Sequence, residues 1–222
     1  DGDGDRLGVV TKEGNIIYPD RQMMLFAADV LSRNPKAKII FDVKCTRNLA
    51  PWIKEYKGEP IMSRTGHSFI KAKMKETGAA LGGEMSGHIF FKERWYGFDD
   101  GMYAGARLLE ILSQVENPSE LLNNLPDAVS TPELNIKMKE GEHHALIATL
   151  QRDAKFTNPD KIIDIDGLRV EYADGFGLAR ASNTTPVIVL RFEADTEEAL
   201  ENIKADFRRV ISAAAPELEL GF

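Results

Sequence analysis

The chain has 222 residues, of which 43% are hydrophobic, enough for one large domain or for two of ordinary size. Its 28 basic and 35 acidic side chains give a net charge of -7, which makes nucleic acid an unexpected partner. The single cysteine, Cys45, excludes an intrachain disulfide, and no apolar run approaches the length of a membrane span or a signal segment. We therefore expect a reduced, cytoplasmic compartment and no membrane partner.

Short extended runs alternate with amphipathic ones through the first half of the chain. The elements that these patterns predict are helices at 21–34, 48–58, 67–78 and 101–115, strands at 37–43, 59–64 and 79–85, and a hairpin at 88–100 that turns near 94–97. Regular alternation of strand and helix is typical of a mostly parallel sheet covered by helices.

Residues 116–133 are rich in proline and asparagine and lack long periodicity, which predicts a linker between two domains. The elements predicted beyond it are a strand at 134–139, a helix at 142–156, two or three antiparallel strands within 161–182, a strand at 186–194 and a helix that begins at Thr196. The fold class is therefore α/β, with a mixed, mostly parallel sheet domain and helices, followed by a smaller α+β domain.

The chain opens with DGDGDR, in which Asp1, Asp3 and Asp5 alternate with glycine. Three carboxylates at this spacing repel one another unless a cation neutralises them, and a hard divalent ion is the natural partner. A calcium loop of the EF-hand type needs glycine at its sixth position and glutamate at its twelfth, where this chain has Arg6 and Lys12. An ordinary surface turn is the remaining alternative to a metal loop.

A second glycine-rich stretch, GGEMSGH, brackets Glu84, Ser86 and His88. An acceptor, a hydroxyl and a titratable ring in one loop could hold the hydroxyls of a sugar. A strand-to-hairpin turn with polar tips is an equally good interpretation of this stretch alone.

The stretch RASNTTP combines an arginine with short hydroxyl and amide side chains, namely Arg180, Ser182, Asn183, Thr184 and Thr185. Phosphate recognition needs such a guanidinium fork together with short donors on a bending backbone. The alternative is that these residues, which precede a proline, only form a turn into the strand that follows.

Two further polar residues follow successive predicted strands. Lys44 and His67 would emerge at the same edge of a parallel sheet, where they are available for proton transfer. Taken singly, a solvated lysine and a structural histidine are the simpler interpretations. His143 and His144, at the start of a predicted helix, are interpreted as surface residues.

In order and spacing, DGDGDR, TGHSFIK, GEMSGH and RASNTTP resemble the motifs of the α-D-phosphohexomutase superfamily, and most closely its bacterial phosphomannomutase/phosphoglucomutase branch. Members have four domains, and this chain is similar to the metal loop of the second and to the whole third and fourth. The resemblance implies a metal-binding loop and the end of a preceding domain at 1–14, an α/β sugar-binding domain at 15–125 and an α+β phosphate-binding domain at 131–222.

The resemblance also implies a chemistry. A phosphoserine donates its phosphoryl group to a hexose 1-phosphate, and the bound 1,6-bisphosphate reorients and returns the other phosphate to the serine. Mg²⁺ is the implied cofactor, held by Asp1, Asp3, Asp5 and a phosphoserine oxygen. The other site residues implied are Arg6 beside the phosphoserine, Lys44 and His67 for proton transfer, Glu84, Ser86 and His88 for the sugar, and Arg180, Ser182, Asn183 and Thr184 for the non-reacting phosphate.

A TxSHNP-like phosphoserine stretch does not occur in the 222 residues, so we expect the chain alone to lack sustained mutase turnover. The loop GEMSGH resembles the version that accepts mannose and glucose. The expected partners are therefore the 1- and 6-phosphates of both sugars, together with the N-terminal domains. The alternatives are a phosphoglucosamine mutase and a non-catalytic module that binds phosphosugar or metal.

Overall fold

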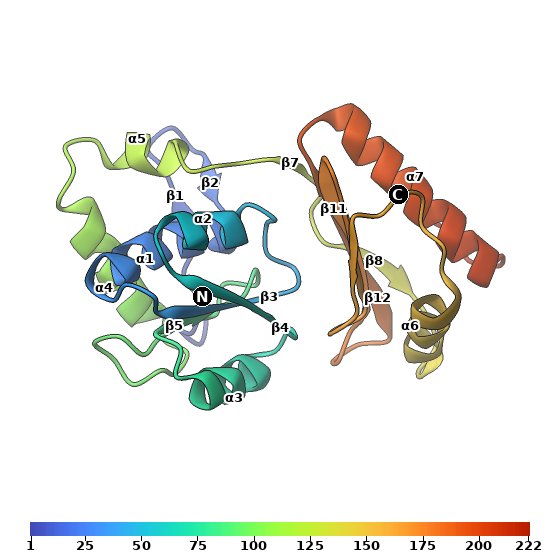
Figure 1. Cartoon of the computed structure of the whole chain (residues 1–222), viewed down its shortest axis with the longest axis horizontal. Helices are drawn as coiled ribbons and strands as arrows, with labels where there is room; N and C mark the ends of the chain where they lie inside the picture. Colours follow the sequence, from blue (N-terminus) through green and yellow to red (C-terminus); the bar gives the residue numbers. More distant parts are fainter. The chain divides into compact units, whose positions relative to one another are not determined.

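The computed structural model describes residues 1–222, which form two compact units, residues 1–127 and residues 128–222. A four-stranded sheet lies at the centre of the first unit (Figure 1). Its strands are β3 (Lys38–Asp42), β4 (Glu59–Ser63), β5 (Leu81–Gly83) and β6 (Ile89–Phe91), in the order β4-β3-β5-β6. β3 runs parallel to β4 and β5, and β6 is antiparallel to β5, so the predicted mixed, mostly parallel sheet is confirmed.

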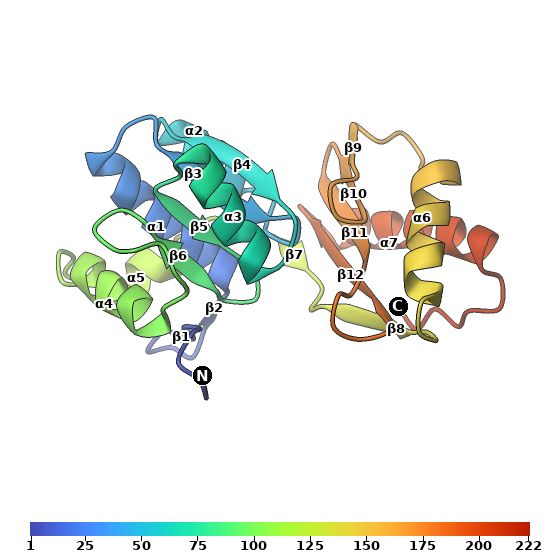
Figure 2. The same ribbon diagram turned by 90° about the horizontal axis from the view of Figure 1, so that it is seen from below.

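Helices cover both faces of this sheet (Figures 1 and 2). They are α1 (Pro19–Arg33), α2 (Leu49–Glu55), α3 (His67–Thr77), α4 (Gly101–Leu112) and α5 (Pro118–Asn123). Successive side chains of β3 point to opposite faces of the sheet, as is typical of a β-strand. Ile39 and Phe41 join the core formed with α1, α2 and α4, whereas Ile40 packs with Ile70 and Met74 of α3 on the opposite face.

The structure corrects the predicted hairpin at 88–100. The hairpin is instead formed by β5 and β6, and its connection is the GEMSGH stretch. Beyond β6 the chain turns with positive φ at Arg94 and Gly97 and returns to β6 only through an isolated bridge between Phe90 and Asp99. The aromatic residues after β6 therefore form a loop and not a strand.

Several short elements lie outside the predicted set. β1 (Val9–Val10) and β2 (Ile16–Ile17) pair as a small antiparallel hairpin after the acidic loop. The predicted linker at 116–133 contains α5, which begins with Pro118 and is capped by Asn117, whose side chain accepts from the Glu120 N–H. Leu122 of this helix is buried in the core of the first unit.

The second unit is a smaller α+β unit built on an antiparallel sheet. Its elements are β7 (Val129–Ser130), β8 (Leu134–Lys137), α6 (Glu142–Asp153), β9 (Lys161–Ile163), β10 (Leu168–Tyr172), β11 (Gly175–Ala181), β12 (Val187–Ala194) and α7 (Glu197–Ala214). The strand order is β7-β12-β11-β10-β9, and β8 also pairs with β12. The predicted fold class is thus confirmed for both parts of the chain.

Helices α6 and α7 pack on the core of this second sheet. The buried residues of α6 are His143, Leu146, Ile147 and Leu150, which follow the helical spacing of a core-facing stripe. His143 is therefore buried at 2% exposure, and its interpretation as a surface residue was wrong, whereas His144 is exposed. None of the helices is both long and apolar enough to cross a membrane.

The first testable prediction concerns the start of α7. Thr196 accepts a hydrogen bond from the Ala199 N–H at 3.1 Å, which satisfies one of the backbone donors left free at a helix start. We expect Thr196→Ala to lower the free energy of unfolding of the second unit by about 1 kcal/mol. Thr149→Ala, the same change inside α6, is the matched control and should alter it by less than about 0.5 kcal/mol. Urea unfolding of both variants measures the difference, and equal losses would contradict the capping role.

Candidate functional site

The acidic loop at the start of the chain gathers three carboxylates at one point. Oxygens of Asp1, Asp3 and Asp5 all lie within 4.8 Å of one another. Gly4 has a φ of +78°, a conformation that glycine adopts without strain and that turns the backbone tightly between Asp3 and Asp5. Oδ1 of Asp5 is buried and accepts no hydrogen bond. Hard carboxylate oxygens in this arrangement suit Mg²⁺, so the residues present fit that ion.

The acidic loop is fixed against the GEMSGH loop and the start of α4. Arg6 forms a backbone bridge with His88, and the Gly101 N–H donates to the Gly4 carbonyl at 3.1 Å. A Cβ at Gly101 would lie 2.8 Å from the Arg6 carbonyl oxygen, so this close approach requires glycine. The Arg6 guanidinium pairs with Asp1 at 2.5 Å and lies 3.6 Å from Asp5, which offsets part of the negative charge.

Glu84 follows β5 and is almost completely buried, at 2% exposure. One carboxylate oxygen accepts from the Gly66 N–H just before α3, and the other accepts from the Ser86 hydroxyl at 3.2 Å. Burial raises the pKa of Glu84, and the negative charge of Asp42 raises it further. The hydrogen bond from the Gly66 N–H and the charges of His88 and Lys44 lower the pKa of Glu84. Glu84 thus joins the loop before α3 to the GEMSGH loop.

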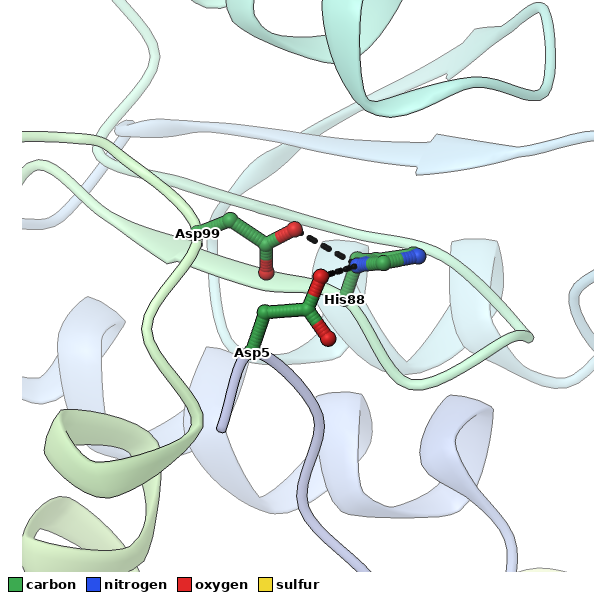
Figure 3. Close-up of side chains that lie close together, drawn as sticks. All are labelled: Asp5, His88 and Asp99. Carbon is green, nitrogen blue, oxygen red and sulfur yellow. Dashed lines mark ion pairs between the residues drawn. The ribbon is translucent and has the colours of Figure 1, made fainter. Parts of the chain in front are cut away.

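His88 lies between two carboxylates (Figure 3). Its Nδ1 is 2.5 Å from Oδ2 of Asp99 and 3.5 Å from Oδ2 of Asp5, and Nε2 points away from both. The contacts are ion pairs and not well-aligned hydrogen bonds, because Nδ1 has no partner with hydrogen-bond geometry. The interaction with Asp99 is the main reason that the pKa of His88 is raised, and Glu84 and Asp5 act in the same direction. Burial of the ring lowers the pKa of His88 and so opposes these effects.

The polar residues after β3, β4 and β5 share one edge of the sheet. These three strands are parallel, so the segments after their carboxyl ends lie at the same edge. Lys44 is buried after β3, and His67 is the exposed first residue of α3 after β4. The ring of His67 lies 6.1 Å from that of His88, and the charge of Lys44 acts on Glu84. The structure therefore places Lys44, His67, Glu84 and His88 at one edge of the sheet, and His88 contacts the acidic loop.

RASNTTP ends β11 and forms the connection to β12 in the second unit. Arg180 pairs with Asp166, with 3.0 Å between Nε and Oδ2. The Ser182 hydroxyl accepts from the backbone N–H groups of Thr184 and Thr185, each at 3.3 Å, which shapes the turn. Asn183 and Thr184 are exposed at its tip. The predicted phosphate residues thus lie together at the end of β11 and in the turn after it, but Arg180 has a carboxylate partner that the sequence did not indicate.

Asp99 is the residue of this site that sequence reasoning missed. It lies in the aromatic loop after β6, and the isolated bridge to Phe90 brings it to His88. The neighbouring Asp100 caps α4 by accepting from the Tyr103 N–H at 2.8 Å and also accepts from the Trp95 indole at 3.2 Å. The sequence has two successive aspartates, Asp99 and Asp100, before a predicted helix. Only one of them can cap the helix, so the pair indicated a different role for the other.

An open groove of about 940 Å³ lies beside the acidic loop, between the β1 segment and α4. Most of its lining is apolar, and the side chains of Val10, Met102 and Leu109 are largely exposed there. Asp1, Arg6 and Lys12 are the charged residues in its wall. The acidic loop therefore opens onto apolar surface on this side.

Two family models match the chain. The model described as phosphoglucomutase/phosphomannomutase, alpha/beta/alpha domain III matches residues 18–129, and the model described as phosphoglucomutase/phosphomannomutase, C-terminal domain matches residues 133–210. The chain belongs to the phosphoglucomutase/phosphomannomutase family. The resemblance that the four motifs indicated is confirmed.

Two similar members of this family come from bacteria. A phosphoglucomutase of Neisseria meningitidis serogroup A is 70% identical over 96% of this chain and 46% of its own length. A phosphomannomutase/phosphoglucomutase of Pseudomonas aeruginosa is 61% identical over 100% of this chain and 48% of its own length. The chain spans about half the length of the curated relatives that it matches.

Solved structures share the fold. A phosphoglucomutase/phosphomannomutase family protein from Burkholderia thailandensis, 66% identical, matches 100% of this chain and 47% of its own chain with a TM-score of 0.95. Aspergillus fumigatus N-acetylphosphoglucosamine mutase in complex with GlcNAc-6P and magnesium matches 96% of this chain and 48% of its own, with a TM-score of 0.69. At 16% identity, the latter is evidence of a common fold.

The second testable prediction concerns the close approach at Gly101. Gly101→Ala should displace the Arg6 backbone and lower the free energy of unfolding by about 1–3 kcal/mol, because the added Cβ meets main-chain atoms. Gly105→Ala, one turn further along α4, is the matched control, since its Cβ would meet only a Leu7 methyl at 3.6 Å. It should be neutral or stabilise by up to about 1 kcal/mol. Backbone NMR shifts of Asp5 and Arg6 measure the displacement, and shifts of the same size in both variants would contradict it.

The third testable prediction concerns the ion pair between His88 and Asp99. Because the folded-state pKa of His88 is raised, its contribution to stability is complete below about pH 6.5 and is lost as the pH rises through the raised pKa. Asp99→Asn should lower that pKa and reduce this pH dependence. Asp100→Asn is the control, since its carboxylate contacts Trp95 and Tyr103 instead. NMR titration of the His88 ring measures the pKa, and an unchanged value in Asp99→Asn would count against the assignment.

Proposed function

We propose that this chain is the C-terminal half of a phosphohexomutase that interconverts the 1-phosphates and 6-phosphates of glucose and mannose. The observation that carries the proposal is the backbone bridge between Arg6 and His88, which joins the acidic loop to the GEMSGH loop in one site. Its close relatives are named phosphoglucomutase and phosphomannomutase/phosphoglucomutase. A carboxylate cluster beside a sugar-hydroxyl loop is what phosphosugar chemistry requires.

In the proposed reaction, the free hydroxyl of a hexose 1-phosphate attacks the phosphorus of a phosphoserine. The hydroxyl loses its proton to a base, the serine oxygen leaves and takes up a proton, and a 1,6-bisphosphate results. The bisphosphate turns, and the serine hydroxyl loses its proton to a base and attacks the phosphorus on O1. O1 leaves and gains a proton, which gives the 6-phosphate and restores the phosphoserine. Positioning and charge stabilisation account for most of the catalysis in such transfers.

We assign the acidic loop to the phosphoserine side of this reaction. Asp1, Asp3 and Asp5 would hold Mg²⁺, with room left for a phosphoserine oxygen. When bound, this ion would neutralise charge on the transferred phosphoryl group. Arg6 lies beside the carboxylates and could donate to the same phosphate. The magnesium in the Aspergillus neighbour of the same fold supports this assignment.

We assign the sugar and the proton transfers to the edge after β3, β4 and β5. Glu84 and Ser86 would accept and donate hydrogen bonds at sugar hydroxyls, with His88 beside them. Lys44 and His67 would move protons at the reacting hydroxyl. Glucose and mannose share their 3- and 4-hydroxyls, so a loop that holds these groups could take either sugar.

We assign the non-reacting phosphate to the loop between β11 and β12. Arg180 supplies a guanidinium, and Ser182, Asn183 and Thr184 supply short polar side chains around the turn. A phosphate would have to compete with Asp166 for Arg180. Under this proposal, residues 1–14 carry the metal loop, 15–125 the sugar site and 131–222 the phosphate site.

Besides the phosphosugar, we propose a second partner, namely the part of the protein that corresponds to the half of the relatives that this chain does not span. The phosphoserine would come from it, since the chain contains no TxSHNP-like stretch. The groove of about 940 Å³ beside the acidic loop supports such packing, because it exposes Val10, Met102 and Leu109 next to the proposed metal ligands. An N-terminal half seated there would bring its phosphoserine to Asp1, Asp3 and Asp5.

The fourth testable prediction follows from the proposed roles. In NMR titrations with glucose 1-phosphate, mannose 1-phosphate and glucosamine 1-phosphate, the first two should shift the Glu84 and Arg180 loops most. Arg180→Ala should weaken binding by about tenfold or more, because a guanidinium forms strong charge-assisted bonds to phosphate, and Lys44→Ala should weaken it less. Inorganic phosphate is the control for binding without the sugar.

Three results would contradict the proposal. The chain alone should show no sustained conversion of glucose 1-phosphate, so turnover would disprove the need for a second half. A larger loss of affinity in Lys44→Ala than in Arg180→Ala would mean that the phosphate loop is misassigned. Preference for glucosamine 1-phosphate would favour the glucosamine branch of the superfamily.

A further inference from the structure

Asp42, the last residue of β3, is completely buried and accepts hydrogen bonds from three separate segments. Oδ1 accepts from the Cys45 thiol and from the Met85 N–H, each at 3.1 Å. Oδ2 accepts from the Thr65 hydroxyl at 2.8 Å. The three donors belong to the segments that follow β3, β4 and β5, so one carboxylate joins the three connections at the same edge of the sheet.

Each of these segments carries a residue of the proposed site. Lys44 precedes Cys45, His67 lies two residues after Thr65, and Met85 lies between Glu84 and Ser86. We propose that Asp42 is a positioning residue that sets the relative placement of Lys44, His67 and Glu84 for the phosphosugar. This inference rests on the proposed function and adds to it a residue that contacts the site loops and not the sugar.

The geometry favours positioning over general support of the core. A buried carboxylate that joined only neighbouring residues would stabilise its own turn. Asp42 instead contacts Thr65 and Met85, which lie 23 and 43 residues further along the chain. Its charge also acts on Glu84, since it is a cause of the raised pKa of that residue after burial itself. A change at Asp42 should therefore reach all three loops and the protonation of Glu84 together.

Two substitutions separate the charge from the hydrogen bonds. Asp42→Asn keeps the shape and one acceptor oxygen but removes the charge, so it should fold and should lower the pKa of Glu84. Asp42→Ala removes all three hydrogen bonds. Asp206→Asn in the second unit is the matched control, because Asp206 is also a buried carboxylate that accepts from several partners, among them Thr157, Tyr172 and Arg209.

The first measurement uses the full 222-residue chain without ligand. Hydrogen exchange at the Met85 N–H should accelerate about tenfold or more in Asp42→Ala, and NMR signals of Cys45 and Thr65 should shift with it. Asp206→Asn should leave all three unchanged. If only one of the three segments responds, or if Asp206→Asn perturbs them equally, the positioning role is wrong.

The second measurement is an NMR titration of the same variants with glucose 1-phosphate. We expect Asp42→Asn to bind about threefold to tenfold more weakly than the unsubstituted chain, and Asp206→Asn to bind equally well. A lower pKa of Glu84 in Asp42→Asn is the readout that a purely structural role would not produce. Unchanged affinity in Asp42→Asn would overturn the inference. Failure of the unsubstituted chain to bind glucose 1-phosphate would instead count against the proposed function, and the exchange measurement would still decide the role of Asp42.

Discussion

Negative charge converges at one edge of the four-stranded sheet, and the groups that balance it determine how that edge is built. Parallel strands place their carboxyl ends together, so Asp42 at the end of β3 and Glu84 directly after β5 act on each other electrostatically. The acidic loop adds Asp5 and two further carboxylates beside His88. Buried carboxylates are costly unless donors or cations face them, so backbone N–H groups, hydroxyls, a histidine and arginine are drawn to the same place.

Hydrogen bonds and a close backbone approach join the loops of the site. Glu84 accepts from Gly66 at the start of α3, and Arg6 of the acidic loop pairs by its backbone with His88. Gly101 at the start of α4 approaches the Arg6 backbone too closely for any larger residue. A divalent cation at the acidic loop would therefore act on an arrangement whose other contacts are already formed, which limits the reorganisation that binding requires.

The two units contribute different chemistry to the proposed reaction. The first holds the carboxylates and the proton-transfer candidates at one edge of its sheet, and the second holds a guanidinium and a polar turn on a β-hairpin. Arg180 already has Asp166 as a partner, so under the proposed function a phosphate that binds there would replace one anion by another. Such an exchange would keep the guanidinium paired without substrate, and it would lower the affinity for substrate.

The sequence alone determined the periodic elements, the fold class and the family. Helical spacing, strand alternation and a start signal such as Thr196 act over a few residues, so they can be read locally. The tertiary structure decided which strands pair and which side chains meet. The hairpin predicted at 88–100 is formed instead by β5 and β6. His143 is buried on the core-facing stripe of α6, and Asp99 pairs with His88. The tertiary structure also joined Asp42 to Thr65 and Met85, contacts between distant positions that no local pattern contains, because strand order and burial depend on the packing of the whole unit.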